Sequence, residues 1–165
     1  MLSGIALRKA LCGSWLLASW NVTTKRLADA THGAPQFPFG RQPVGLLIYS
    51  PDGYMSATVS AGDRTRFNAG ASPRQLPAAA LADAFISYFH YAGRWWVEGE
   101  EVLHRVEAAL NPNMVDTTQV RHASLDGKRM LLTGIETLAD RERRHEIAWR
   151  RAEATPAKRE NEQSA

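Results

Sequence analysis

Two polar side chains on neighbouring predicted strands are the first candidates for chemistry. His104 stands in the alternating stretch 101–110, on the same face as Val102 and Val106, because side chains two residues apart in a strand point the same way. An imidazole in an apolar row acts as a general acid or base on an enolisable ligand. The alternative is a core histidine bonded to a tyrosine or to the backbone, and the sequence leaves both roles open.

Arg121 is the second candidate, on the predicted strand 116–125, which follows a turn at 111–113. Gln119 shares its face. A guanidinium inside a barrel is costly unless it is hydrogen-bonded, and a carboxylate or carbonyl group of a ligand would accept its donors. The alternative is a bracing role, in which backbone carbonyls or Gln119 satisfy the guanidinium.

The register of these two strands decides whether both candidates face one interior. If paired residue numbers add to an odd number, with Val106 or His104 opposite Arg121, both side chains point inward. In an even-sum register, Glu107 lies opposite Arg121 and forms a cross-strand ion pair on the wall. We adopt the odd-sum register because the face that carries His104 is the more apolar one.

A hairpin supplies further candidates at residues 44–60. The turn Pro51-Asp52-Gly53 separates VGLLIYS from YMSATVS, and glycine allows the positive φ that such a turn needs. A short loop there places Tyr49 opposite Met55 and Leu47 opposite Ala57. The candidate ligand-binding residues are then Tyr49, Met55, Trp95, His104, Gln119 and Arg121, and the candidate catalytic residue is His104.

The rest of the chain divides into short segments typical of an all-β protein. Short strands follow one another in hairpin succession, which favours an antiparallel barrel or sandwich. We expect an N-terminal helix in 1–12, a barrel in 13–151, a second short helix at 76–88, a polar break at 136–143 and a disordered polar tail in 152–165. The N-terminal helix should turn Leu2, Ile5, Ala6 and Leu11 toward the body of the protein.

Four stretches resemble a known family. They are Gly13-Ser14-Trp15, PVGLLIYSPDGYMSA, AGRWWVEGEEVLHRVEAALNPN and TTQVRHASLDGKRMLLT. Together they resemble the bacterial and fungal lipocalin-like domain family of the calycin superfamily, over about residues 12–151. The resemblance implies an up-and-down barrel of about eight strands, with space for one small ligand.

The same resemblance implies a structural role for the first tryptophan of the barrel. In calycins this tryptophan closes the barrel floor beneath a basic residue of the last strand. Trp15 matches it, and Arg150 or Arg151 would be the basic partner. If Trp15 points inward, strand alternation also predicts inward positions for Ser19 and Asn21.

Composition excludes several classes of function. The net charge of +3 is too small to indicate nucleic acid as a partner. One cysteine, Cys12, excludes an internal disulfide framework. We find no metal-ligand spacing, no phosphate-binding loop and no cofactor motif. The apolar start is broken by Arg8 and Lys9, so we expect neither a signal peptide nor a membrane span. We therefore expect a cytoplasmic protein.

These observations lead to three hypotheses about function. The first is a barrel that binds a hydrophobic or amphipathic small molecule. The second is an isomerase or cyclase that acts on a polyketide- or terpenoid-like substrate, with His104 as its acid or base. The third is a barrel filled by its own side chains. A continuous interior of ~300 Å³ with convergent polar groups would favour the first two. The sequence leaves the oligomeric state open.

Overall fold

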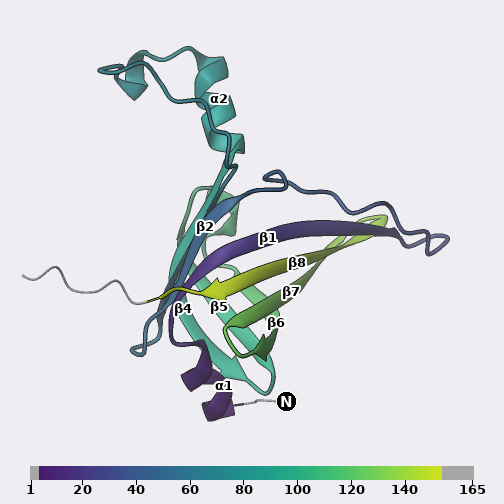
Figure 1. Ribbon diagram of the computed structural model, residues 1–165. Helices are drawn as coiled ribbons and strands as arrows, with labels where there is room; N and C mark the ends of the chain where they lie inside the picture. Colours follow the sequence, from purple (N-terminus) through teal and green to yellow (C-terminus); the bar gives the residue numbers. More distant parts are fainter. Residues whose placement is uncertain (1–3, 154–165) are drawn as a thin grey trace, which may run out of the picture.

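The computed structural model describes residues 4–153 and shows a closed antiparallel barrel of eight strands (Figure 1). Each strand pairs with the next one in the chain, and β8 pairs with β1 to close the barrel. This architecture confirms the predicted all-β barrel. The elements are α1 (Gly4–Leu11), β1 (Gly13–Arg26), β2 (Val44–Tyr49), β3 (Tyr54–Ser60), a 3-10 turn (Pro73–Gln75), α2 (Ala78–Ile86), β4 (Tyr88–Glu98), β5 (Glu101–Ala109), a 3-10 turn (Pro112–Met114), β6 (Thr118–Asp126), β7 (Arg129–Leu138) and β8 (Arg141–Arg151).

Both predicted helices are present; α2 is shorter than the expected 76–88, and α1 ends at Leu11. α1 buries Leu7 and Leu11, whereas Ile5 is 88% exposed. The expected inward positions of Ile5 and Ala6 are therefore wrong, because the buried face of this short helix runs through Leu7 and Leu11. The inward position of Leu11 is confirmed, and Leu2 lies outside the described residues. Most of the predicted tail, 154–165, lies outside the described residues. No helix within the described part of the chain is long and apolar enough to cross a membrane.

The hairpin between β2 and β3 has the predicted register. Tyr49 pairs with Met55 and Leu47 with Ala57. Gly53 in the turn has a φ of 93°, a conformation that glycine adopts without a steric penalty. The pairing places these four side chains in the barrel core.

The register between β5 and β6 is of the predicted odd-sum type. His104 pairs with Gln119, and Arg121 pairs with Val102, which is two residues from His104 and four from Val106, the two partners that we expected for Arg121. The even-sum register is wrong: Glu107 instead lies 3.5 Å from Arg94 on β4, on the outer wall. His104 and Arg121 therefore both face the interior.

A β-bulge in β1 reverses the side-chain alternation after Leu17. Leu17 pairs with Trp149, but the next paired residue is Ser19, opposite Ala148. The extra residue turns Trp20 into the core, at 8% exposure. The expected inward positions of Ser19 and Asn21 are therefore wrong.

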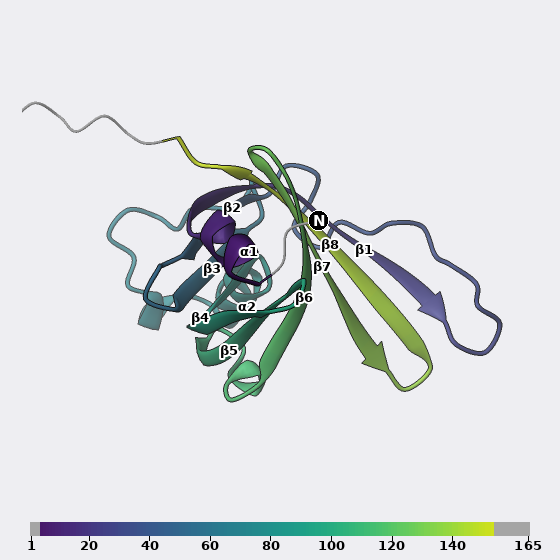
Figure 2. The ribbon, with the colours of Figure 1, turned by 90° about the horizontal axis from the view of Figure 1, so that it is seen from below.

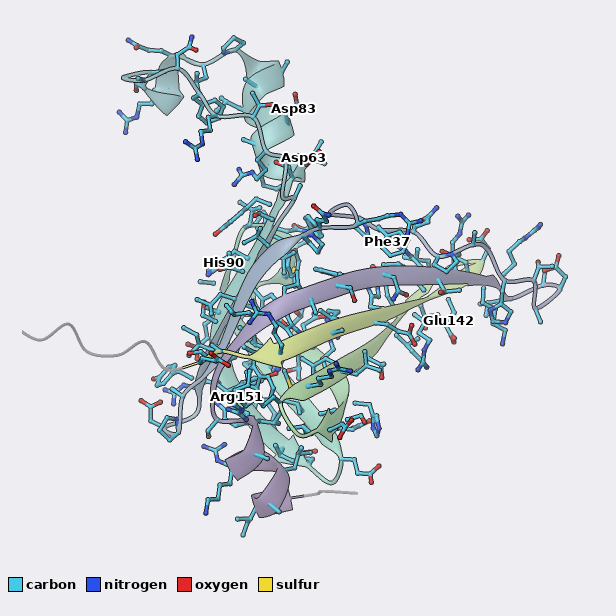
Figure 3. The ribbon with its side chains drawn as sticks, viewed as in Figure 1. Phe37, Asp63, Asp83, His90, Glu142 and Arg151 are labelled. Carbon is cyan, nitrogen blue, oxygen red and sulfur yellow. The ribbon has the colours of Figure 1, made fainter. Side chains whose placement is uncertain are left out.

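One end of the barrel is sealed by α1, which lies across it in the view from below (Figure 2). Arg151 stacks on Trp15, with 4.0 Å between Cζ and the ring centroid. Its guanidinium also donates to the carbonyl oxygens of Ala10 and Cys12 at the end of α1, where helix carbonyls lack helical partners. Figure 3 shows Arg151 beside this helix. Arg151 is thus the basic residue of the floor, whereas Arg150 is exposed.

At the other end, the wall divides between β6 and β7. Their ladder runs from the 126–129 pair to the 122–133 pair. Beyond it, β7 continues beside β8 as far as Leu138, and Figure 2 shows β7, β8 and β1 diverging from β5 and β6. The predicted polar break at 136–143 is therefore wrong, because these polar residues form a solvent-exposed ribbon that stays paired.

Candidate functional site

A buried histidine held by two tyrosines lies at the centre of the barrel. Tyr49 Oη is 2.8 Å from His104 Nε2, and Tyr91 Oη is 2.8 Å from Nδ1. The three residues come from β2, β5 and β4, and His104 is only 1% exposed. Burial, and secondly the charge of Arg121, lower the pKa of His104 to about 3. His104 is therefore a neutral imidazole with both ring nitrogens occupied.

Arg121 lies where β6 and β7 separate. Its Nη1 donates to the carbonyl of Val120 at 2.8 Å and its Nη2 to Oε1 of Gln119 at 3.3 Å. Within residues 4–153, no carboxylate lies within salt-bridge distance of this guanidinium. A guanidinium has five donors, so these two bonds leave most of its capacity for another acceptor.

Gly134 on β7 provides the room for this guanidinium. A Cβ at Gly134 would lie 2.7 Å from Nη1 of Arg121, closer than nonbonded atoms approach. The side chain of Arg121 thus packs directly against the backbone of β7. This contact fixes the guanidinium in the opening between the two strands.

Two spaces meet at Arg121. An inner cavity of about 20 Å³ lies against His104, Tyr91 and Trp149. A cleft of about 320 Å³ lies outside it, between β6 and the extended part of β7 and β8. Three residues border both spaces, namely Trp20, Phe89 and Arg121.

The cleft combines apolar and polar walls. Phe89, Met114 and Ile135 contribute apolar surface. Glu136 is the one carboxylate of the cleft lining, and it forms an ion pair with Arg143 at 3.2 Å. This carboxylate therefore already has a cationic partner. The remaining residues of the lining are Trp20, Asn111, Gln119, Arg121, Gly134 and His145.

His145 connects the mouth of the cleft to the core. Its Nδ1 accepts a hydrogen bond of 3.2 Å from Trp20 Nε1, and its Nε2 lies 3.6 Å from Glu136. Burial lowers the pKa of His145, and the charges of Arg121 and Arg143 act in the same direction. The neutral form, which can accept from Trp20, is therefore favoured.

The six predicted ligand-binding residues fall into two groups. Gln119 and Arg121 border the cleft, and His104 borders the inner cavity. The other three are buried toward the closed end, where Trp95 packs on Tyr49 at 4.5 Å between ring centroids. Whether these residues contact a ligand stays a prediction for each of them. The residues of the closed-end group are Tyr49, Met55 and Trp95.

Three residues of the two spaces were missed from the sequence. Trp20 was missed because the inward positions expected for Ser19 and Asn21 imply an outward Trp20, and nothing in the local sequence marks the β-bulge. His145 was missed because the residues beside it, Trp20 on β1 and Glu136 on β7, meet it only in the folded barrel. Trp149 was noted only as a neighbour of the basic floor residues, although its alternation with Ile147 could have revealed an inward position.

A larger surface hollow lies outside the barrel. It measures about 640 Å³ and is bounded by residues 39–44 together with Gly62 and Asp63. Loop residues form its walls, whereas the cleft at Arg121 leads into the barrel interior. The barrel cleft is therefore the better candidate for a specific site.

An eight-stranded barrel with an apolar interior and a cleft at one end defines a class of small-molecule-binding proteins. The model of the lipocalin-like domain matches residues 12–152, so the chain belongs to the lipocalin-like domain family. This membership supports a ligand-binding barrel in general. Comparison with curated proteins finds no matching sequence.

Proposed function

We propose that this protein binds a hydrophobic or amphipathic small molecule in the cleft between β6 and β7, with a carboxylate or carbonyl group of the ligand at Arg121. The observation that carries the proposal is the partly buried guanidinium of Arg121. It borders both the cleft and the inner cavity and has no carboxylate partner among the described residues. A ligand oxygen would complete its hydrogen bonds.

The cleft walls suit the apolar part of such a molecule. Trp20 and Phe89 form an edge-to-face pair, with 5.3 Å between their centroids, where the cleft meets the inner cavity. Met114 and Ile135 lie farther out. A cleft of about 320 Å³ is at the small end of the range for ligand pockets. A compact ligand or a short acyl chain is therefore the expected occupant.

The alternative hypothesis was an isomerase or cyclase that uses His104 as its acid or base. Both nitrogens of His104 are bonded to tyrosines, and its pKa of about 3 lies far below the neutral range. A general acid or base works best with a pKa near the operating pH. This geometry supports binding more than catalysis by His104. We also propose a cytoplasmic setting, which the single cysteine supports together with the charged residues Arg8 and Lys9 in the apolar start.

Titration with decanoate and decanol tests the proposal. Both probes should bind and change the tryptophan fluorescence, because Trp20 borders the cleft. In Arg121→Gln, decanoate should bind about tenfold more weakly, as expected for a lost hydrogen bond to a charged group. Arg150→Gln is the matched control, since Arg150 is exposed on the outer wall. If the wild-type protein binds neither decanoate nor decanol, the proposal is wrong.

A further inference from the structure

Trp149 carries a buried hydrogen-bond donor with no acceptor. Its Nε1 is the one buried side-chain nitrogen or oxygen of the described residues that makes no hydrogen bond, and the residue is 4% exposed. Buried indole N–H groups normally find an acceptor. Trp149 is a lining residue of the inner cavity, which makes an acceptor in that cavity the candidate partner for the group.

The hydrogen bonds around His104 leave a second unused donor beside the same cavity. A neutral imidazole has one N–H group and one acceptor nitrogen. Tyr49 is fully buried, does not border the cavity, and makes no other side-chain hydrogen bond within the described chain, so its hydroxyl must donate to Nε2. The Nδ1–H group then donates to Tyr91 Oη. The hydroxyl hydrogen of Tyr91 has no partner left, and Tyr91 borders the cavity.

Arg121 supplies the third set of donors. Arg121 lines both the cavity and the cleft, and its guanidinium makes two hydrogen bonds within the described part of the chain. The other cavity walls are mainly apolar, among them Leu47 and Leu132. Three residues with unused donor hydrogens, Trp149, Tyr91 and Arg121, thus line one space, and most of its other walls are apolar.

The size and polarity of this space indicate its occupant. About 20 Å³ is enough for one oxygen atom with little else. A water molecule would accept here, but its own two hydrogens would lack acceptors. An oxygen that only accepts, next to an unpaired positive charge, meets all the donors. A carboxylate oxygen has these properties.

We propose that the inner cavity is the subsite for one oxygen of a ligand carboxylate, which accepts hydrogen bonds from Trp149 Nε1, Tyr91 Oη and the Arg121 guanidinium. The hydrocarbon part of the ligand lies in the cleft. This inference rests on the proposed function and narrows it to monocarboxylates. His104 is a positioning residue in this site, because it orients the hydroxyl of Tyr91.

The test compares decanoate with decanol in Trp149→Phe and Tyr91→Phe. Tyr91→Phe removes the hydroxyl and keeps the ring, and Trp149→Phe removes the indole N–H and leaves a smaller aromatic ring. The preference for decanoate over decanol should fall about fivefold in each, since the loss of a single hydrogen bond changes affinity by about that factor. A purely structural defect would weaken both ligands equally. The matched controls are Trp96→Phe and Tyr54→Phe, because Trp96 bonds Glu98 outside the barrel and Tyr54 is 43% exposed.

The outcomes separate this inference from the proposed function. If decanoate binds and Arg121→Gln weakens it, but both donor variants keep the wild-type preference, the carboxylate subsite is refuted and the binding function stands. Equal affinity of the wild type for decanoate and decanol refutes the subsite together with the Arg121–carboxylate contact, and leaves only the binding of an apolar molecule in the cleft. If the wild type binds neither probe, both proposals are refuted.

Discussion

The environment of His104 determines its chemistry. Its inward position could be predicted from the apolar row of Val102 and Val106, since strand alternation is a local property. Its partners could not be predicted, because Tyr49 and Tyr91 come from β2 and β4 and meet it only once the barrel has closed. The sequence therefore indicated a buried imidazole but not the tyrosines that occupy both of its nitrogens.

The lowered pKa of His104 predicts a pH-dependent stability. The folded protein keeps this histidine neutral down to about pH 3, whereas an unfolded chain protonates it near 6.5. Between these values the unfolded chain binds more protons, so acidification lowers the free energy of unfolding. This residue contributes about 1.4 kcal/mol for each pH unit. The contribution of His104 to the free energy of unfolding is complete above pH 6.5 and is lost progressively as the pH falls below that value.

His104→Gln isolates this contribution. Glutamine keeps one donor and one acceptor group but does not titrate. Urea unfolding at several pH values between 4 and 6.5 should show a shallower pH dependence for the variant than for the wild type. The carboxylates titrate in both proteins and cancel in the comparison. Identical slopes would mean that folding does not lower the pKa of His104.

At the scale of elements, the presence of each strand was more predictable than where the strand ends and which of its side chains point inward. The β2–β3 hairpin followed from its turn residues, and its register is confirmed. In β1, the bulge after Leu17 reversed the face of Trp20, although no glycine or proline marks the position. The ends of β7 and β8 were missed because both faces of their ribbon are polar, and a period of two is then invisible.

The junction of α1 with the barrel floor predicts a difference between two adjacent arginines. Arg151 stacks on Trp15 and donates to two carbonyl oxygens at the end of α1, whereas Arg150 is exposed. Arg151→Met should lower the free energy of unfolding by about 2 kcal/mol, from the lost cation–π and hydrogen-bond contributions. Arg150→Met should change it by less than about 0.5 kcal/mol. Chemical denaturation measures both, and equal effects would contradict the assigned floor.

At the scale of the whole molecule, the barrel itself was predictable and its opening was not. Hairpin succession and the family resemblance both indicated about eight strands, and eight are observed. The opening depends on where the β6–β7 ladder ends, at the 122–133 pair, which no local pattern encodes. The interior is accordingly divided, with little space beside His104 and a larger cleft beyond Arg121.

The tryptophans of the barrel report on each region separately. Trp15 and Trp95 donate to backbone carbonyls near the closed end, at 2.8 and 3.0 Å. Trp96 bonds Glu98 on the outer wall. Trp20 and Trp149 border the inner cavity. A ligand in the proposed position should therefore affect the last two and leave the others unchanged.

The indole N–H resonances in a ¹⁵N-labelled sample, titrated with decanoate, test the position of the ligand most directly. Each resonance is assigned by its loss in the corresponding Trp→Phe variant. We expect the Trp20 and Trp149 resonances to shift as decanoate binds, while the Trp96 resonance stays in place. Binding that shifts only Trp96, or leaves both Trp20 and Trp149 unmoved, would contradict a ligand site between β6 and β7.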